Sequence, residues 1–351
     1  MIKTELLNAR MDTAEGIANI ERAAACIRAG GLVVFPTETV YGLGADGTSA
    51  EAAEKIYKAK GRPSDNPLII HIADPGDASL YAEVNSLYFR LAEAFMPGPL
   101  TVVMRAKESV PMQTRGGLAT VAVRCPEHPV ANLLIEKAGV CIAAPSANLS
   151  GKPSPTDASQ VAEDMMGRVD IILDDGSADF GLESTIVKIE DSGILTLLRP
   201  GKITPEEIEK AAGVPLAISD AVTDRLKEGE AAPSPGMKYR HYAPSAPVTL
   251  LDGNAERQVA YIKEKGEDSI GIIAYDEDMP LFESAFPNAK LYAFGKKEDE
   301  LLQAHLLFAI LRRADKEALS HIYAPLPRKS GIGLALYNRM IRAASHHIVR
   351  L

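Results

Sequence analysis

Positively charged side chains of this sequence concentrate on predicted loops and at the ends of apolar segments. Seven residues share this placement: Lys60, Arg62, Arg115, Arg124, Arg199, Lys238 and Arg240. The chain as a whole is acidic, with a formal net charge of −9, so these cations do not belong to a generally basic surface. Because open α/β sheets bind ligands at their strand ends, the pattern favours a polyanionic ligand that carries phosphates.

Several of these residues also have an ordinary structural explanation. Lys60 ends a helical segment, where a cation stabilises the helix dipole by about 0.3–1 kcal/mol. Arg62 lies beyond that segment, and the dipole does not account for it. His71 sits inside an apolar strand and, taken alone, is more often a satisfied core histidine than a base. Arg199 precedes Pro-Gly, where an exposed surface ion pair is the competing interpretation.

Small polar residues follow two of the apolar segments. In PTETVYG (36–42), Pro36 cannot donate to a sheet ladder, so the strand should end there and direct the hydroxyls of Thr37 and Thr39 into a cleft. In APSANLSGKPS (144–154), backbone amides and hydroxyls on a tight loop can bind an anion. We do not predict Ser146 as a nucleophile, because no Gly-x-Ser-x-Gly elbow surrounds it.

Three glycines match the Gly-x-Gly-x-x-Gly pattern of dinucleotide-binding turns: Gly42, Gly44 and Gly47. A nicotinamide oxidoreductase therefore stays open as an alternative, although Asp74 lies farther away than the expected ~20 residues. Another alternative is an RNA-binding module without catalysis, which would hold a phosphate backbone on a basic surface. A P-loop is not indicated, since neither Gly151-Lys152 nor Gly201-Lys202 precedes Ser or Thr.

Alternating helical and strand segments must position these residues. Helices are predicted at 17–27, 48–61, 77–95, 129–138, 157–166 and 204–213. Strands are predicted at 32–35, 67–72, 100–106, 120–125, 140–144, 169–173, 184–189 and 194–199. Capping boxes are predicted for Thr48 with Glu51 and for Thr204 with Glu207. Because several strands follow one another without room for a helix, we expect a mixed sheet in an α/β domain.

The chain of 351 residues is long enough for about two domains. Residues 214–247 carry five prolines and lose the periodic pattern, which is typical of a linker. This linker also packs together Lys238, Tyr239, Arg240, His241 and Tyr242, as a flap over an anionic ligand would. We predict a catalytic domain at 1–213, a linker and active-site flap at 214–247, and a C-terminal α/β domain at 248–351. In that last domain strands are expected at 248–252, 269–275, 290–294 and 321–325, and helices at 254–264, 297–314 and 331–344.

Composition limits the class of protein further. Hydrophobic residues make up 46% of the chain, which fits a globular protein, and no apolar run approaches the ~20 residues of a membrane helix. We therefore expect a cytoplasmic protein without a membrane partner. The cysteines Cys26, Cys125 and Cys141 are far apart and odd in number, so we expect buried free thiols and no zinc site.

Several motifs together resemble the YrdC-type L-threonylcarbamoyladenylate synthase family. They are PTETVYGLGAD, KGRPSDNPLIIHI, PGPLT, PSANLSG, STIV and LLRPG. The linker SPGMKYRHYAP and the later SGIGLALYNRMIRAAS resemble the two-domain form of the family. The resemblance implies a YrdC-like, twisted, open mixed sheet with helices, followed by a smaller Rossmann-like α/β domain. It also implies that the glycines of 42–47 turn a strand at the mouth of the site, and that their redox-like spacing is coincidental.

The resemblance also implies an enzyme, a nucleotidyltransferase. Family members combine L-threonine, bicarbonate or CO2, and ATP to give threonylcarbamoyl-AMP and pyrophosphate, for the N6-threonylcarbamoyladenosine (t6A) modification of tRNA. The implied cofactor is Mg²⁺, held through the ATP phosphates and not by a side-chain site. The implied partners beyond the substrates are tRNA and downstream threonylcarbamoyl-transferase proteins.

Three groups of site residues carry over from the family. The implied catalytic residues are Lys60, Arg62, Ser146 and Asn148. The implied L-threonine residues are Thr39, His71, Arg124, Ala144 and Ser184. The implied ATP residues are Arg62, Asn66, Thr120, Ser146, Ser154 and Arg199, together with Tyr239 or Tyr242 of the linker. On this assignment Arg124 holds the threonine carboxylate, and catalysis consists of positioning and of neutralising charge at the α-phosphate.

Overall fold

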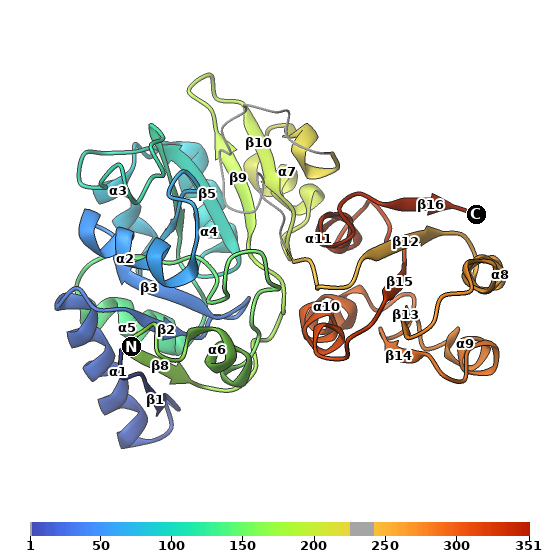
Figure 1. Cartoon of the computed structure of the whole chain (residues 1–351). Helices are drawn as coiled ribbons and strands as arrows, with labels where there is room; N and C mark the ends of the chain where they lie inside the picture. The colour runs from blue at the N-terminus through green and yellow to red at the C-terminus, as the bar shows by residue number, and fades with distance from the viewer. Residues whose placement is uncertain (1, 225–241) are drawn as a thin grey trace. The chain divides into compact units, whose positions relative to one another are not determined.

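The computed structural model describes residues 2–224 and 242–351 of the chain. These residues form two compact units, each described here by itself (Figure 1). The first unit comprises Met1–Ser150 and Ser154–Lys238, and the second comprises Gly151–Pro153 and Tyr239–Leu351. Among the predicted flap residues, 225–241 lie outside the described residues, and these include Tyr239.

The first unit is organised around a long mixed sheet. Its strands are β1 (Glu5–Asn8), β2 (Val33–Phe35), β3 (Gly42–Asp46), β4 (Ile69–His71), β5 (Leu100–Arg105), β6 (Thr120–Arg124), β7 (Ile142–Ala143), β8 (Ile171–Asp174), β9 (Thr185–Ile189), β10 (Leu195–Arg199) and β11 (Leu216–Ile218). Their order across the sheet is β1-β8-β2-β3-β7-β4-β6-β5-β9-β10-β11. The sheet contains parallel pairs such as β4–β6 and antiparallel pairs such as β5–β6, which confirms the predicted mixed sheet.

Helices of the first unit bury their apolar faces against this sheet. They are α1 (Ala14–Arg28), α2 (Ala50–Lys60), α3 (Ala78–Tyr81), α4 (Ser86–Phe95), α5 (Pro129–Ala138), α6 (Ala158–Met165) and α7 (Pro205–Ala212). Ile20 and Ile27 of α1 and Leu134 of α5 share one core cluster with Val33 of β2 (Figure 1). The capping box predicted for Thr204 and Glu207 is present at the start of α7.

Two helix predictions were wrong in detail. α2 begins at Ala50 with Ser49 as its cap, because the Thr48 hydroxyl donates instead to Asp46 at 2.7 Å. The single helix predicted at 77–95 is divided into α3 and α4, since Ala82 is extended and Asn85 caps a new helix by accepting from the Tyr88 amide. Local hydrogen-bonding side chains therefore decide both helix starts.

The glycines of the dinucleotide-like pattern do not form a phosphate-binding turn. Gly42 and Gly44 lie inside β3, between β2 and β7, and not at a turn as predicted. A Cβ atom on Gly44 would come within 2.7 Å of both Phe35 and Ile142, so this position requires glycine for close packing. The redox-like spacing is therefore coincidental, as expected, and it gives no support to a nicotinamide enzyme.

The start of the predicted linker extends the first sheet. Within 214–247, Leu216–Ile218 forms β11, which pairs in parallel with β10, and a short 3-10 helix follows at Asp220–Val222. The sequence did not predict this short strand, because the prolines and the aperiodic later part of 214–247 made the whole segment resemble a linker.

The second unit contains a parallel sheet. Its strands are β12 (Val248–Asp252), β13 (Ile270–Ala274), β14 (Lys290–Ala293), β15 (His321–Pro325) and β16 (Ile348–Arg350), in the order β14-β13-β15-β12-β16. Its helices are α8 (Ala255–Lys265), α9 (Met279–Ala285), α10 (Glu300–Asp315) and α11 (Gly333–Ala343). The apolar faces of α8 and α9 share a core cluster with β12, β13 and β15 (Figure 1). A second α/β unit is confirmed, although α9 and β16 are too short to be predicted from periodicity.

Cys125 and Cys141 are buried as predicted, whereas Cys26 is only partly buried. Cys26, Cys125 and Cys141 are free, and burial raises the pKa of the Cys26 thiol to about 11 and that of the Cys125 thiol to about 12. Such thiols stay protonated at neutral pH and are poor nucleophiles. Of the helices in the described ranges, none is long and apolar enough to cross a bilayer.

Candidate functional site

Three polar side chains form a row across the middle of the first sheet. His71 of β4 is the register partner of Arg124 of β6, and Arg124 is the partner of Thr101 of β5. Paired residues of adjacent strands present their side chains on the same face. His71 and Arg124 are buried, with 4% of each exposed, and Thr101 is fully buried. The sheet therefore brings two of the predicted L-threonine residues together.

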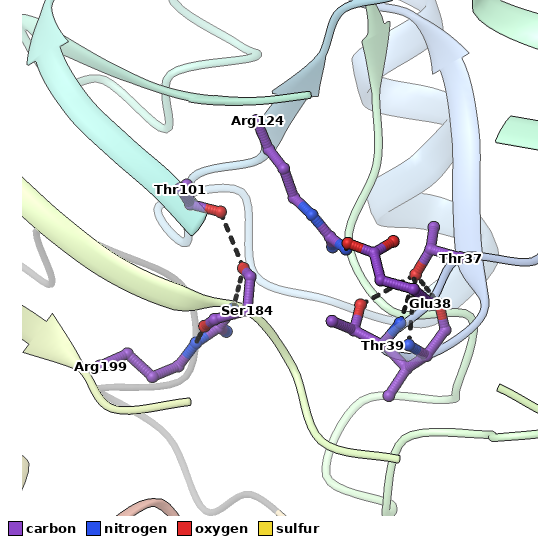
Figure 2. A network of polar contacts seen from close by, with 8 residues as sticks. Thr37, Glu38, Thr39, Thr101, Arg124, Ser184 and Arg199 are labelled. Atoms are coloured by element: carbon purple, nitrogen blue, oxygen red, sulfur yellow. Dashed lines mark hydrogen bonds and ion pairs between the residues drawn. The ribbon is translucent and has the colours of Figure 1, made fainter. Parts of the chain in front are cut away.

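Arg124 makes a buried ion pair with a residue that the sequence did not single out. Its Nη2 donates to Oε1 of Glu38 at 2.7 Å, and only 5% and 7% of the two side chains are exposed (Figure 2). An unpaired charge at such depth is strongly unfavourable, so removing either residue would leave the other as an uncompensated buried charge. Arg124 is thus fixed in direction before any ligand arrives.

Glu38 points inward because residues 36–41 are not a strand. Alternation along a strand would place Thr37 and Thr39 on one face and Glu38 on the other. Instead all three side chains are buried. The Thr37 hydroxyl donates to the Val40 carbonyl at 2.6 Å and lies 2.8 Å from the Thr39 hydroxyl. Pro36, with no amide hydrogen to pair, was the available sign that this segment leaves the sheet.

A second hydrogen-bonded group lies at the neighbouring strand ends. Ser184, just before β9, has its Oγ 2.7 Å from Oγ1 of Thr101 and 3.1 Å from Nη2 of Arg199 (Figure 2). Arg199 also donates to the Ser184 carbonyl at 3.0 Å and is only 7% exposed. It is therefore a buried, oriented cation, and the exposed surface ion pair considered for it is wrong. Thr101 is a second residue that the sequence did not single out.

Lys60 joins two predicted motifs. At the end of α2 it is 2% exposed, and its Nζ donates to the backbone carbonyls of Ser146 and Asn148, at 2.6 Å for the latter. The Lys60 carbonyl in turn accepts from the Ser150 amide. Ser146 Oγ donates to Asn148 Oδ1 at 2.5 Å. The loop at 146–150 is thereby fastened to the helix, which goes beyond a helix-dipole contact.

Arg62 and Asn66 share the short loop after α2. Arg62 donates to the backbone carbonyls of Asn66 and Pro67 at 3.2 and 3.0 Å, which fixes its guanidinium. Oδ1 of Asn66 is buried and accepts no hydrogen bond from the described residues. A Cβ atom on Gly116 would lie 2.9 Å from the Pro67 nitrogen, so the loop that carries Arg115 packs directly on this one. Arg115 itself keeps a buried Nε that bonds to no described residue.

The remaining predicted residues lie on the same sheet or beside it. Thr120 begins β6, on the same face as Arg124 at its end, since the two are four positions apart. Ala144 directly follows β7 and is 3% exposed. Ser154 Oγ donates to Glu183 Oε1 at 2.6 Å, and both residues are buried.

Tyr242 belongs to the second unit. It is 4% exposed and stacks on Phe308 with ring centroids 5.0 Å apart, and its backbone has a φ of 62°. The structure therefore packs its ring against Phe308 of α10. Its expected contact with ATP stays a prediction, as does that of Tyr239.

His71 is held as a neutral ring. Its Nδ1 lies 3.2 Å from the Ile69 carbonyl and 3.3 Å from the Ile142 carbonyl, so Nδ1 carries the proton and Nε2 is the acceptor. Burial, and then the nearby Arg124 charge, lower the pKa of His71 to about 3. His71 is therefore suited to accept a hydrogen bond at neutral pH and not to carry a charge.

This low pKa predicts a specific loss of stability in acid. Below pH 6.5, His71 binds a proton in the unfolded chain but stays neutral in the folded protein. The free energy of unfolding therefore falls as the pH drops from 6.5 toward 3. Between pH 7.5 and 5.0 we expect His71 to contribute a loss of about 2 kcal/mol. Urea unfolding of the wild type and of His71→Asn, which keeps a donor for the carbonyls, measures it. An equal pH dependence in both proteins would contradict the low pKa.

The arrangement is suited to binding and positioning. Buried donors come from Arg124, Arg199 and Lys60, and hydroxyls come from Thr39 and Ser184. In the described part of the chain no group of three His, Cys, Asp or Glu residues could hold a metal ion. In the described ranges, Ser146 bonds to the Asn148 side chain and Ser184 to Thr101 and Arg199, which gives neither serine the histidine base of a catalytic triad.

Comparisons with known proteins match both units. The family described as "Telomere recombination" matches residues 25–201, and the family described as "Threonylcarbamoyl-AMP synthase, C-terminal domain" matches residues 203–345. A Bacillus subtilis protein named threonylcarbamoyl-AMP synthase is 41% identical over 94% of this chain and 94% of its own length. A Pyrococcus abyssi protein of the same name is 43% identical over 95% of this chain and 96% of its own length.

Solved structures agree with the sequence relatives. The crystal structure of Pyrococcus abyssi Sua5 complexed with L-threonine is 41% identical to this chain. It matches with a TM-score of 0.87 and covers 99% of both chains. At this identity and coverage, the likeness extends to both units and is not limited to the fold of one of them.

Proposed function

The chain belongs to the threonylcarbamoyl-AMP synthase family in its two-domain form, and we propose that it forms threonylcarbamoyl-AMP and pyrophosphate from L-threonine, bicarbonate or CO2, and ATP. The observation that carries this proposal is the fixed, buried guanidinium of Arg124 beside the hydroxyl of Thr39 and the neutral His71. These groups complement a small hydroxylated amino acid, and the P. abyssi relative was solved with L-threonine.

We assign the L-threonine pocket to the residues around the central row. Arg124 supplies the donors for the carboxylate, and the neutral His71 supplies an acceptor. The other members of the proposed pocket are Thr39, Ala144 and Ser184. The buried hydrogen bonds of Thr39 and Ser184 support this assignment, because they fix the hydroxyls in direction and lower the entropy lost when a ligand binds.

We assign ATP to the neighbouring loops. The proposed ATP residues are Arg62, Asn66, Thr120, Ser146, Ser154 and Arg199, with Tyr239 or Tyr242 added from the flap. In support, the contacts of Lys60 with the 146–150 loop join the two halves of the catalytic set Lys60, Arg62, Ser146 and Asn148. Mg²⁺ is proposed to enter with ATP as part of the substrate, since the described residues offer no cluster of their own for a metal.

The reaction then needs positioning and charge neutralisation. The threonine amine and CO2 give a carbamate, whose oxygen attacks the α-phosphorus of ATP in line with the departing pyrophosphate. Arginine and lysine side chains neutralise the developing charge, and no covalent bond to the protein is required. Holding both reactants in register can supply several of the ~7–11 kcal/mol attributed to oriented reactions.

Pyrophosphate release tests the proposed function. We expect the purified full chain to release pyrophosphate from ATP only when L-threonine and bicarbonate are both present. Omitting either one, with CO2 removed from the buffers, should reduce release to the background rate. Pyrophosphate release that does not depend on L-threonine would contradict the proposal. Salt-sensitive tRNA binding without any release would favour the RNA-binding alternative instead.

The product is proposed to serve the t6A modification of tRNA through a downstream transferase. A mixed anhydride of AMP is an activated acyl group, so a second protein must accept it before water does. The net charge of −9 gives no general attraction for tRNA, and the transfer is therefore assigned to that partner.

A further inference from the structure

The ion pair of Glu38 and Arg124 leaves one atom of each residue unmatched. Nη2 of Arg124 and Oε1 of Glu38 bond at 2.7 Å. Oε2 of Glu38 and Nε of Arg124 are also buried, and neither bonds to any residue that the structure describes. Buried polar atoms are nearly always satisfied, so an acceptor and a donor left together in one pair indicate a missing partner with both functions.

The hydroxyl of Thr39 adds a second acceptor on the Glu38 side. Thr37 uses its only hydroxyl proton on the Val40 carbonyl. The 2.8 Å bond between the two threonine hydroxyls must therefore be donated by Thr39. Thr39 Oγ1 then has lone pairs to offer but no proton. The segment 37–39 is thus an accepting surface, and it faces the donating guanidinium of Arg124 (Figure 2).

A simple carboxylate fits this pair poorly. Arg124 is already neutralised by Glu38, so a second anion would meet the negative charge of Glu38 and the lone pairs of Thr39. A ligand with a carboxylate and an ammonium on the same carbon gives each side its complement. The carboxylate then bonds to Arg124, and the ammonium bonds to Oε2 of Glu38.

We propose that Glu38 binds the α-ammonium group of L-threonine and so selects an α-amino acid over other small hydroxylated carboxylates. This inference rests on the proposed function and adds a specificity-determining residue to it. Because both unmatched atoms are shielded from solvent, the ligand reaches them through a rotation of the Glu38 or Arg124 side chain. The ammonium then meets a carboxylate that has already lost its water, which makes the bond strong.

The test combines a substitution of Glu38 with removal of the amine from the ligand. Isothermal titration calorimetry on the full chain measures the affinity for L-threonine and for (R)-3-hydroxybutanoate, which is threonine without its amine. In the wild type we expect L-threonine to bind at least about 30-fold more tightly. In Glu38→Gln we expect L-threonine to lose about 30-fold or more in affinity, while (R)-3-hydroxybutanoate keeps or gains affinity. The preference for the amine should therefore disappear.

Controls separate this role from simple support of Arg124. Glu183→Gln removes another buried carboxylate of the same unit and should leave the ratio of the two affinities unchanged. If Glu38→Gln fails to fold, Glu38→Asp keeps the charge but withdraws it by one methylene, and the ratio should still fall. Equal weakening of both ligands by the Glu38 variant, or no change for L-threonine, overturns the inference. A wild type that binds no L-threonine overturns the proposed function instead.

Discussion

Replacing Arg124 with alanine should lower kcat/KM for L-threonine by about 30-fold or more. Truncating one partner of a buried, hydrogen-bonded charge pair costs about 2–5 kcal/mol, and the proposed substrate carboxylate loses its main donor as well. Steady-state pyrophosphate release at varied L-threonine measures the effect. Most of the loss should appear at subsaturating threonine, since the missing contact is made by the bound carboxylate before and during the reaction.

The same substitution should also destabilise the fold, because Glu38 remains as a buried charge without a partner. We expect a loss of about 3–5 kcal/mol in the free energy of unfolding. Arg124→Lys separates the two effects, since lysine can keep the charge beside Glu38 but lacks the planar fork of donors. It should remain folded and still lose much of its activity.

Arg105→Ala is the matched control. Arg105 lies on β5 of the same sheet, but its side chain is 60% exposed and its ion pair with Glu83 spans 3.5 Å. Such exposed pairs contribute about 0–1 kcal/mol, so both activity and stability should stay close to the wild type. A folded Arg124→Lys or Arg124→Ala protein with normal turnover would remove Arg124 from the site.

Much of the central row could be predicted because it depends on local pattern. Apolar β-branched runs mark β4 and β6, and polar residues at their ends are placed by the alternation of the strand. Arg124 was therefore predicted at a strand end and His71 inside an apolar strand, and the register of β4 with β6 makes them neighbours. The pairing itself joins residues 53 positions apart, and periodicity carries no information about it.

Glu38 could not be predicted in the same way. Its partner Arg124 is 86 positions away, and its inward direction depends on a segment that leaves the regular alternation. The prediction that Gly42 and Gly44 form a turn was wrong for a related reason. Gly44 is required by the closeness of Phe35 and Ile142 on either side of β3, and a motif of glycines alone does not distinguish close packing from a phosphate turn.

Lys60 shows both what the local sequence predicts and what only the tertiary structure decides. Its position at a helix end was predicted, and a helix-dipole role was a fair alternative. The contact with the 146–150 loop joins positions 86 and 88 residues apart, which only the folded sheet brings together. The sequence predicts that a lysine ends this helix. Whether that lysine acts on the helix dipole or anchors the 146–150 loop depends on the tertiary structure.

Lys60→Met should lower kcat by about 100-fold, the scale expected when catalytic groups shift by about 1 Å. Methionine keeps the length and the apolar stem of the buried side chain but offers no donor to the carbonyls of Ser146 and Asn148. The loop that carries both proposed catalytic residues then loses its anchor to α2. The effect should fall mainly on kcat measured at saturating ATP and L-threonine, because misplacement acts on the reacting geometry.

Lys58→Met controls for the loss of a positive charge at the end of the same helix. Lys58 is exposed, so its replacement removes a similar dipole contact worth about 0.3–1 kcal/mol and should leave kcat unchanged. If Lys60→Met also kept kcat within about threefold, a difference below 1 kcal/mol, the anchor would contribute nothing to catalysis. Lys60 would then be only a buried cation at a helix end, and its contact with the 146–150 loop would contribute to stability alone.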